Sequence, residues 1–202
     1  MIELPLDLPA ELVPLSWLIG VWEGSGVIDY TIGEERVSHE FGQRISFSHD
    51  GLPHLNYNSY TWLFPTEDGG EPRPLVTEMG YWRLSRALGD ADPGPGMLPG
   101  IGARAFTNPQ AVETLRNSDG GFDIEVNLVH PGGVTELYLG QVKGPRIDMA
   151  TDAVMRTQGA KAYSAATRLY GLVENHLLWA WDIAALGQDL RTHASARLAK
   201  AE

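Results

Sequence analysis

The sequence predicts an all-β fold: an antiparallel up-and-down β-barrel of about ten strands with a short N-terminal helix. From Leu18 onward, short segments rich in β-branched and aromatic residues are separated by Gly, Pro, Asn and Asp. These segments follow one another through short turns without intervening helices, which indicates an antiparallel meander. A barrel is favoured over a sandwich because closing the meander removes the exposed strand edges that promote aggregation.

The elements follow in chain order. Residues 8–19 predict a short helix that caps one mouth of the barrel, and Pro9 and Pro14 limit its length. The expected strands are residues 22–31, 36–48, 55–64, 76–85, 122–129, 134–139, 146–150, 162–172, 177–183 and 190–198. Turn signals lie between them at residues 50–53, 68–70, 119–121, 131–133 and 174–175.

One region departs from the strand pattern. Residues 87–118 include a run rich in Gly, Pro and Asp that predicts an irregular loop. Loops of this length are usually functional or disordered. A surface insertion is the favoured interpretation, and a lid over the barrel cavity is the alternative. With this insertion, residues 1–202 are expected to form a single domain.

The composition excludes several classes of function. The chain has no cysteine, which removes disulfides, thiolate metal sites and cysteine nucleophiles. Its net charge of -11 is spread along the sequence and argues against nucleic acid as a partner. A membrane span is not expected, because no apolar run reaches about 18 residues. Acidic residues near the N-terminus argue against a signal peptide, so a cytoplasmic location is expected.

Gly20, Trp22, Gly24 and Gly26 form the sharpest local motif, Gly-x-Trp-x-Gly-x-Gly at the start of the first strand. Glycines there allow a close approach of backbone either to backbone or to a ligand. Strand residues follow the motif where a helix would be required, so it does not predict a dinucleotide-binding loop. No serine-hydrolase elbow occurs in the sequence, and adjacent carboxylates fall in turn-like segments.

Six histidines are candidate ligands, and no two share the close spacing of a dedicated zinc site. His39 lies in a predicted strand, where imperfect alternation leaves its face undecided. The other histidines outside the last strand lie next to Gly, Pro or Asn in predicted turns, where exposure is ordinary: His49, His54, His130 and His176.

His193 lies in the last predicted strand among small residues, which leave room beside its ring for a flat ligand. Period-two alternation places it on the face opposite Ala194, Ala196 and Leu198. On the residues alone, a surface histidine is therefore favoured, and periodicity does not establish which way the ring points.

Both ends of the chain resemble the nitrobindin family. Residues 15–30, with the glycine–tryptophan motif, look like the family's opening strand. Gly187, Gln188, Leu190, His193, Ala196 and Leu198 resemble its last strand. Residues 77–83, 129–136 and 160–170 look like further family segments. The resemblance covers most of residues 15–200 and fails over the insertion.

The resemblance implies a lipocalin-like or fatty-acid-binding-protein-like barrel that holds haem b. His193 would be the axial ligand of the haem iron and the catalytic residue, and Lys161 would lie near the haem edge. The implied activity is isomerisation of peroxynitrite to nitrate at ferric haem, binding of nitric oxide, or both. The partners would be these small molecules, with a homodimer left open.

The alternative is a haem-free carrier or sensor of a fatty acid or another small apolar ligand. In that case Arg191 or Arg197 would meet the carboxylate of the ligand. Fold alone does not choose between the two functions.

Overall fold

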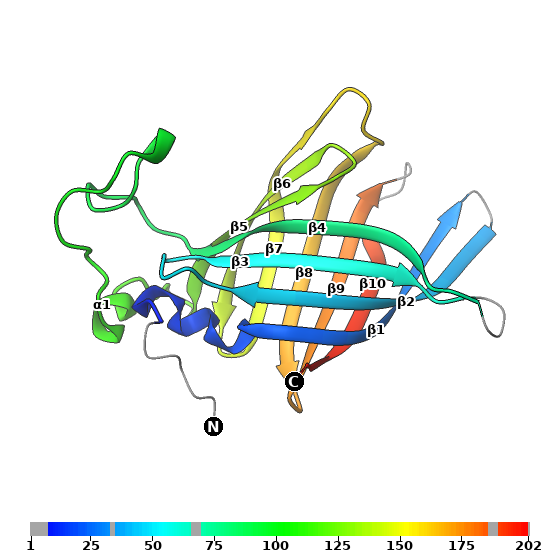
Figure 1. Cartoon of the computed structure of the whole chain (residues 1–202), viewed down its shortest axis with the longest axis horizontal. Helices are drawn as coiled ribbons and strands as arrows, with labels where there is room; N and C mark the ends of the chain where they lie inside the picture. Colours follow the sequence, from blue (N-terminus) through cyan, green and yellow to red (C-terminus); the bar gives the residue numbers. More distant parts are fainter. Residues whose placement is uncertain (1–7, 33–34, 66–69, 186–189, 202) are drawn as a thin grey trace.

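The computed structural model describes residues 8–32, 35–65, 70–185 and 190–201. These residues form ten strands in a closed barrel in which each strand pairs with its chain neighbours and β1 pairs with β10 (Figure 1). The strands are β1 (Gly20–Ile32), β2 (Glu35–Ser48), β3 (Leu55–Leu63), β4 (Arg73–Leu84), β5 (Phe122–His130), β6 (Val134–Lys143), β7 (Arg146–Arg156), β8 (Tyr163–Val173), β9 (His176–Ala185) and β10 (Arg191–Lys200). The predicted antiparallel meander is confirmed.

The N-terminal helix is a 3-10 helix, η1 (Ala10–Leu18). Pro9 precedes it and Pro14 lies inside it, and a proline cannot donate the backbone hydrogen bond that a longer α-helix needs. Leu12, Leu15 and Leu18 are fully buried and seal one end of the barrel, which we call the closed end.

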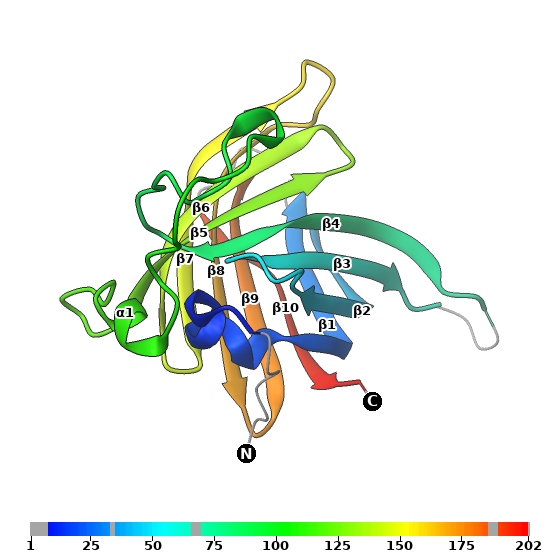
Figure 2. The same ribbon diagram turned by 60° about the vertical axis from the view of Figure 1, so that its left-hand side comes forward.

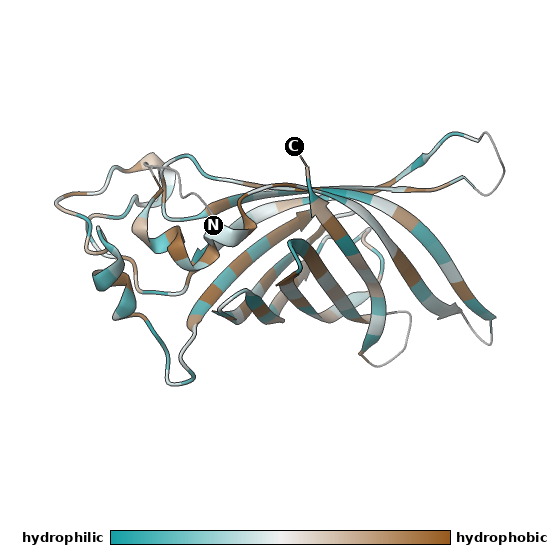
Figure 3. Ribbon diagram, turned by 90° about the horizontal axis from the view of Figure 1, so that it is seen from below, coloured by the Kyte–Doolittle hydropathy of each residue, from teal (hydrophilic) through white to brown (hydrophobic). Residues whose placement is uncertain are grey.

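The strands show the alternation expected of a filled barrel (Figure 3). Along β5, Phe122, Ile124, Val126 and Leu128 are buried, while the residues between them are more exposed. Trp82 is the centre of the aromatic core, with ring centroids of Phe47, Tyr57 and Tyr170 at 5.4, 5.7 and 5.2 Å. This packed half of the barrel adjoins η1 and supports the open half.

At the end opposite η1, which we call the mouth, the walls separate. β1 pairs with β10 only as far as Ile28 and Ala194, and the rest of β1 pairs with β2 alone. On the other side, the first half of β4 pairs only with β3, because its ladder with β5 begins at Met79. The barrel therefore widens toward the mouth.

The insertion lies at the closed end. It contains η2 (Pro95–Met97) and α1 (Pro109–Glu113), and α1 packs beside η1 (Figures 1 and 2). Arg86 ties the insertion to η1 by pairing with both Asp92 and Glu11. The lid interpretation is wrong because β4 ends and β5 begins at the end of the barrel away from the mouth.

None of the helices among the described residues is long and apolar enough to cross a membrane.

Candidate functional site

A pocket of about 340 Å³ lies inside the mouth, between the inner faces of β1 to β4 and of β8 to β10. Its walls are largely apolar and aromatic, with Ile28, Phe41, Trp179 and Trp181 among them. Such a volume and lining are typical of small-molecule sites. His193 lines this pocket together with its neighbour Ala194.

A β-bulge brings His193 into the pocket. Thr192 pairs with Asp182 and Ala194 with Trp181, so His193 is an extra residue without a partner on β9. A bulge breaks the period of two and redirects a side chain. The expectation that His193 is a surface histidine is therefore wrong, because strict alternation does not hold at this position.

Two aromatic rings hold the His193 side chain. The ring centroids of Tyr30 and Trp181 each lie 5.9 Å from that of His193, and the Trp181 ring is perpendicular to it. No hydrogen bond joins the imidazole to any described residue. Burial lowers the pKa of His193 below its ordinary 6.5. A neutral imidazole with an available nitrogen lone pair is therefore the form expected at neutral pH.

Trp181 is itself held by two side chains, one over its ring and one stacked with it. The guanidinium carbon of Arg168 lies 4.3 Å from the ring centroid, and His130 is stacked at 6.4 Å with an interplanar angle of 13°. The Trp181 indole N–H is buried and has no hydrogen-bond partner among the described residues. Trp181 thus carries a buried donor that is not satisfied from within the described part of the chain.

Arg168 forms a buried ion pair with Glu78 in which Nη1 and Nη2 donate to the two carboxylate oxygens at 2.7 and 2.9 Å. The Tyr57 hydroxyl also donates to Glu78, at 2.6 Å. Burial alone would raise the pKa of Glu78, but attraction to Arg168 and these hydrogen bonds lower it to about 2. Burial and the nearby carboxylate raise the pKa of Tyr57 well above 10, so it remains a donor.

A second carboxylate, Glu136, is completely buried. It accepts hydrogen bonds from Tyr138 and Tyr163, and His130 Nε2 lies 2.6 Å from it. The expectation that His130 is an exposed turn residue is wrong, because β5 extends to His130 and its alternation turns that side chain inward. The shared parity of Phe122, Val126, Leu128 and His130 was the signal in the sequence.

The glycine–tryptophan motif closes the barrel. A Cβ on Gly24 would lie 2.4 Å from the Arg197 carbonyl oxygen, and one on Gly26 would lie 2.2 Å from that of Ser195. The motif therefore permits close approach of the β1 and β10 backbones, the first of the two interpretations. Trp22 is buried and donates its indole N–H to the Leu18 carbonyl at 2.7 Å.

Gly20 begins β1 with a positive φ of 129°. A Cβ there would lie 2.6 Å from Lys200 Cε, so Gly20 also belongs to the seam between β1 and β10. None of the described lining residues of the mouth pocket is one of these three glycines. The motif thus closes the barrel and positions the strand that contributes Ile28 and Tyr30 to the mouth pocket.

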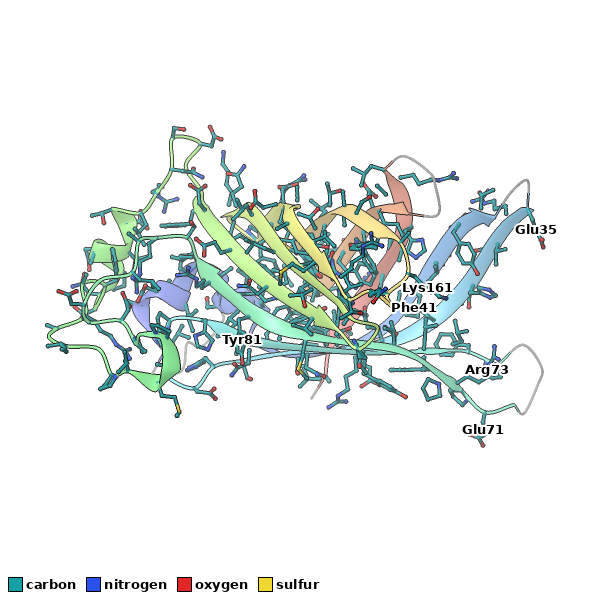
Figure 4. All side chains as sticks on the ribbon, turned by 90° about the horizontal axis from the view of Figure 1, so that it is seen from above. Glu35, Phe41, Glu71, Arg73, Tyr81 and Lys161 are labelled. Atoms are coloured by element: carbon teal, nitrogen blue, oxygen red, sulfur yellow. The ribbon has the colours of Figure 1, made fainter. Side chains whose placement is uncertain are left out.

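The remaining candidates lie outside the pocket lining. Lys161 is exposed on the connection between β7 and β8 at the mouth, as labelled in Figure 4. His39 is exposed and lies opposite Ile28 in the β1–β2 ladder. His49, His54 and His176 are half-buried near turns at the closed end. Gly187 and Gln188 lie outside the described residues.

The two arginines considered as carboxylate partners are also displaced from the pocket. Arg191 and Arg197 are exposed, and neither lines the pocket. Arg197 Nη2 lies 4.0 Å from the Glu174 carboxylate near the β8–β9 turn. The expectation that one of them meets a ligand carboxylate in the pocket is wrong. The arginine inside the barrel is Arg168, which sequence reasoning missed.

Comparisons with known proteins agree with this geometry. Residues 11–200 match the model of the family described as THAP4-like, heme-binding beta-barrel domain. A peroxynitrite isomerase of Clavibacter michiganensis subsp. michiganensis is 71% identical over 198 residues, covering 98% of each chain. One of Leifsonia xyli subsp. xyli is 70% identical over 202 residues, covering 100% of each.

A solved structure is similar along its whole length. The crystal structure of Rv2717c from M. tuberculosis superposes with a TM-score of 0.65 at 26% identity and covers 99% of this chain and 100% of that one. Together with the family match, this confirms the nitrobindin resemblance. The chain belongs to the THAP4-like, heme-binding beta-barrel domain family.

Proposed function

We propose that this chain binds haem b in the mouth pocket, with His193 as the axial ligand of the iron, and that it isomerises peroxynitrite to nitrate. The observation that carries the proposal is the bulge at His193, which brings a neutral imidazole without a hydrogen-bond partner among the described residues into a largely apolar pocket. The family description and the names of the two relatives support it.

The residues of the pocket fit a haem. The unengaged His193 nitrogen is the type of donor that haem iron takes on its axial face. Ile28, Phe41 and Trp179 provide apolar surface for the porphyrin. Among the described residues of the lining, Glu78 is the one carboxylate, and its charge is already balanced by Arg168, so this part of the lining would present no unpaired negative charge to a porphyrin.

When bound, ferric haem would supply a Lewis acid that holds an oxygen of peroxynitrite while its O–O bond rearranges. The conversion of peroxynitrite to nitrate conserves every atom and needs no co-reactant. The protein's contribution is to hold and orient. His193 is fixed between Tyr30 and Trp181, and the aromatic walls would surround a bound group with apolar surface.

Lys161 is proposed to lie near the haem edge, where its ammonium would meet a propionate. Its exposed position at the mouth supports this role. Arg156 Nη1 donates to the Lys161 carbonyl at 3.1 Å and so fixes the backbone of this connection. Lys161→Ala should weaken haem binding less than His193→Ala does, because a solvent-exposed ion pair contributes at most about 1 kcal/mol.

We further propose that nitric oxide would bind the haem iron that His193 holds. Of the described residues that line the pocket, no other is histidine and none is methionine, which supports the view that the protein would supply one iron ligand and leave room for a small molecule. Two more predictions accompany the proposal: the protein acts in the cytoplasm, and its assembled state is a monomer or a homodimer.

The decisive experiment is product analysis. Haem-loaded protein should accelerate peroxynitrite decay in stopped-flow absorbance and raise the nitrate share of the products over the nitrite share. His193→Ala should lose both effects, whereas His176→Ala, which changes a histidine at the closed end, should retain them. Decay at the rate of free ferric haem, with unchanged product ratios, would overturn the proposed activity.

A further inference from the structure

The Arg168–Glu78 pair lies in the barrel interior, and both residues line the pocket. Arg168 on β8 has a 2% exposed side chain, and Glu78 on β4 has an 11% exposed side chain and lines the pocket. The two residues are 90 positions apart in the sequence. They are joined across the barrel, and not along one sheet ladder, because β4 and β8 do not pair.

The geometry of this pair is that of a bound carboxylate. Both terminal nitrogens of Arg168 donate in parallel to the two oxygens of Glu78, which is the preferred arrangement between guanidinium and any carboxylate. The rest of the guanidinium is also engaged. Nε donates to Tyr138 Oη at 3.2 Å, and Nη1 lies 3.5 Å from Tyr170 Oη. No pair of donors on Arg168 remains available for a ligand.

The charges around Arg168 also oppose an incoming anion. Glu136 Oε2 lies 3.7 Å from Arg168 Nη2, so two buried carboxylates share one guanidinium. Burial alone would raise the pKa values of both carboxyl groups, but Arg168 and hydrogen bonds lower them. Both groups are therefore ionised at neutral pH. His130 lies beside both, 2.6 Å from Glu136 and 3.6 Å from Glu78. A third carboxylate in this pocket would meet like charges at close range.

We propose that Glu78 determines the specificity of the pocket by occupying, from within the chain, the site at which a carboxylate ligand would bind Arg168. Glu78 thereby excludes fatty acids and similar anions from a pocket whose aromatic walls would otherwise accept their apolar chains. Removing the Glu78 carboxylate exposes an anion site that the native protein keeps filled. This inference concerns the haem-free pocket and does not depend on haem binding.

The test measures a gain of function in the haem-free, full-length protein. Octanoate is titrated into wild type and Glu78→Ala by calorimetry, with thermal unfolding measured alongside. We expect no saturable binding to wild type at millimolar octanoate. Glu78→Ala should bind at least about tenfold more tightly, and octanoate should raise its unfolding temperature, because a buried guanidinium that has lost its bidentate carboxylate, and keeps only the 3.7 Å contact with Glu136, regains such a partner.

Three controls define the site. Glu78→Ala/Arg168→Met should lose the gain, since no guanidinium remains. The affinity for octanol should be the same in wild type and Glu78→Ala, because octanol has no charge to pair with Arg168. Glu125 forms a comparable ion pair with Arg83 between two barrel strands, but outside the pocket. Glu125→Ala should therefore not gain octanoate affinity. If Glu78→Ala does not fold, Glu78→Ser also removes the carboxylate and leaves the anion site open.

Equal octanoate affinity in wild type and both Glu78 variants would overturn the inference. A gain that persists without Arg168 would also overturn it, because the site would then lie elsewhere. Neither result bears on His193, whose role is read from the haem spectrum, so failure of this inference is distinguishable from failure of the proposed function.

Discussion

His193 illustrates how a single extra residue changes the chemistry of a strand. Without the bulge, the ring would lie on the face opposite Ala194, outside the barrel. The bulge coincides with the end of the β1–β10 ladder at Ile28 and Ala194, where the backbone no longer has to satisfy a neighbour on that side. The end of the β1–β10 pairing and the inward turn of His193 thus occur at the same place in β10.

The pH dependence of haem affinity follows from the burial of His193. Iron and a proton compete for the same nitrogen, and burial lowers the pKa of the imidazole below 6.5. Affinity should therefore be constant from pH 8 to 6.5 and should fall by about tenfold per pH unit only below the lowered pKa. Visible-absorbance titrations across this range measure it. A decline that begins above pH 6.5 would contradict a buried, neutral ligand.

The lowered pKa of His193 also sets how the stability of the apo-protein depends on pH. A histidine whose pKa is lowered by folding binds its proton more readily in the unfolded chain. The contribution of His193 to the apo-protein is therefore fully present above the unfolded pKa and is lost as pH falls toward the folded one. Burying the His193 imidazole therefore lowers the free energy of unfolding only at acidic pH.

The seam between β1 and β10 depends on glycine. Gly26→Val would place Cβ 2.2 Å from the Ser195 carbonyl oxygen and 2.6 Å from Phe41 Cζ. Because backbone cannot yield as a flexible side chain can, we expect the free energy of unfolding to fall by about 1–3 kcal/mol or more. Gly89→Ala is the control, since nothing lies within 4 Å of its added Cβ. Equal urea midpoints for the two variants would refute a tight seam.

The insertion should be dispensable for haem binding because it lies at the closed end. Replacing residues 94–99 with two glycines retains Arg86 and its partner Asp92, which tie the insertion to the barrel. Haem affinity should remain that of wild type in the same titration. A marked loss would mean that the insertion acts on the mouth after all.

Alternation along the strands predicted all ten elements, and the largest error in their bounds lies toward the mouth, with a smaller one at the closed end, where β6 extends to Lys143 and not to residue 139. β7 was expected to end at residue 150 and extends to Arg156. Past Ala150 this strand no longer pairs with β8, and Thr151 Oγ1 instead bonds to the backbone of Ala166. Exposed strand ends of this kind bury neither face, so they lack the hydrophobic pattern from which a strand is recognised.

The polar part of the site was not predicted because its members are distant in sequence. Arg168 and Glu78 have no local motif, and the barrel alone brings them together. A weaker signal existed, since Arg168 shares its parity with buried Ala166 and Tyr170. For His193 the family resemblance was the better guide, because a bulge leaves no trace in the alternation of small residues.

Over the whole molecule, closure couples every strand to two neighbours. Loss of any one strand would expose two ladder edges, so partial unfolding is costly. We propose that residues 1–202 unfold as a single domain, the insertion included, because Arg86 joins it to η1. Far-ultraviolet circular dichroism and tryptophan fluorescence should give coincident urea transitions. Two separated transitions would show that part of the chain folds independently.

His193, turned inward by the bulge, is proposed to bind haem iron. The most direct test is a ferric-haem titration of the apo-protein followed by its visible absorption spectrum, with His193→Ala titrated alongside. We predict saturable one-to-one binding with a sharp Soret band in wild type and its loss in the variant. Weak haem binding that is the same in wild type and His193→Ala would contradict this role of His193. It would favour the alternative, in which the pocket binds an apolar ligand other than haem.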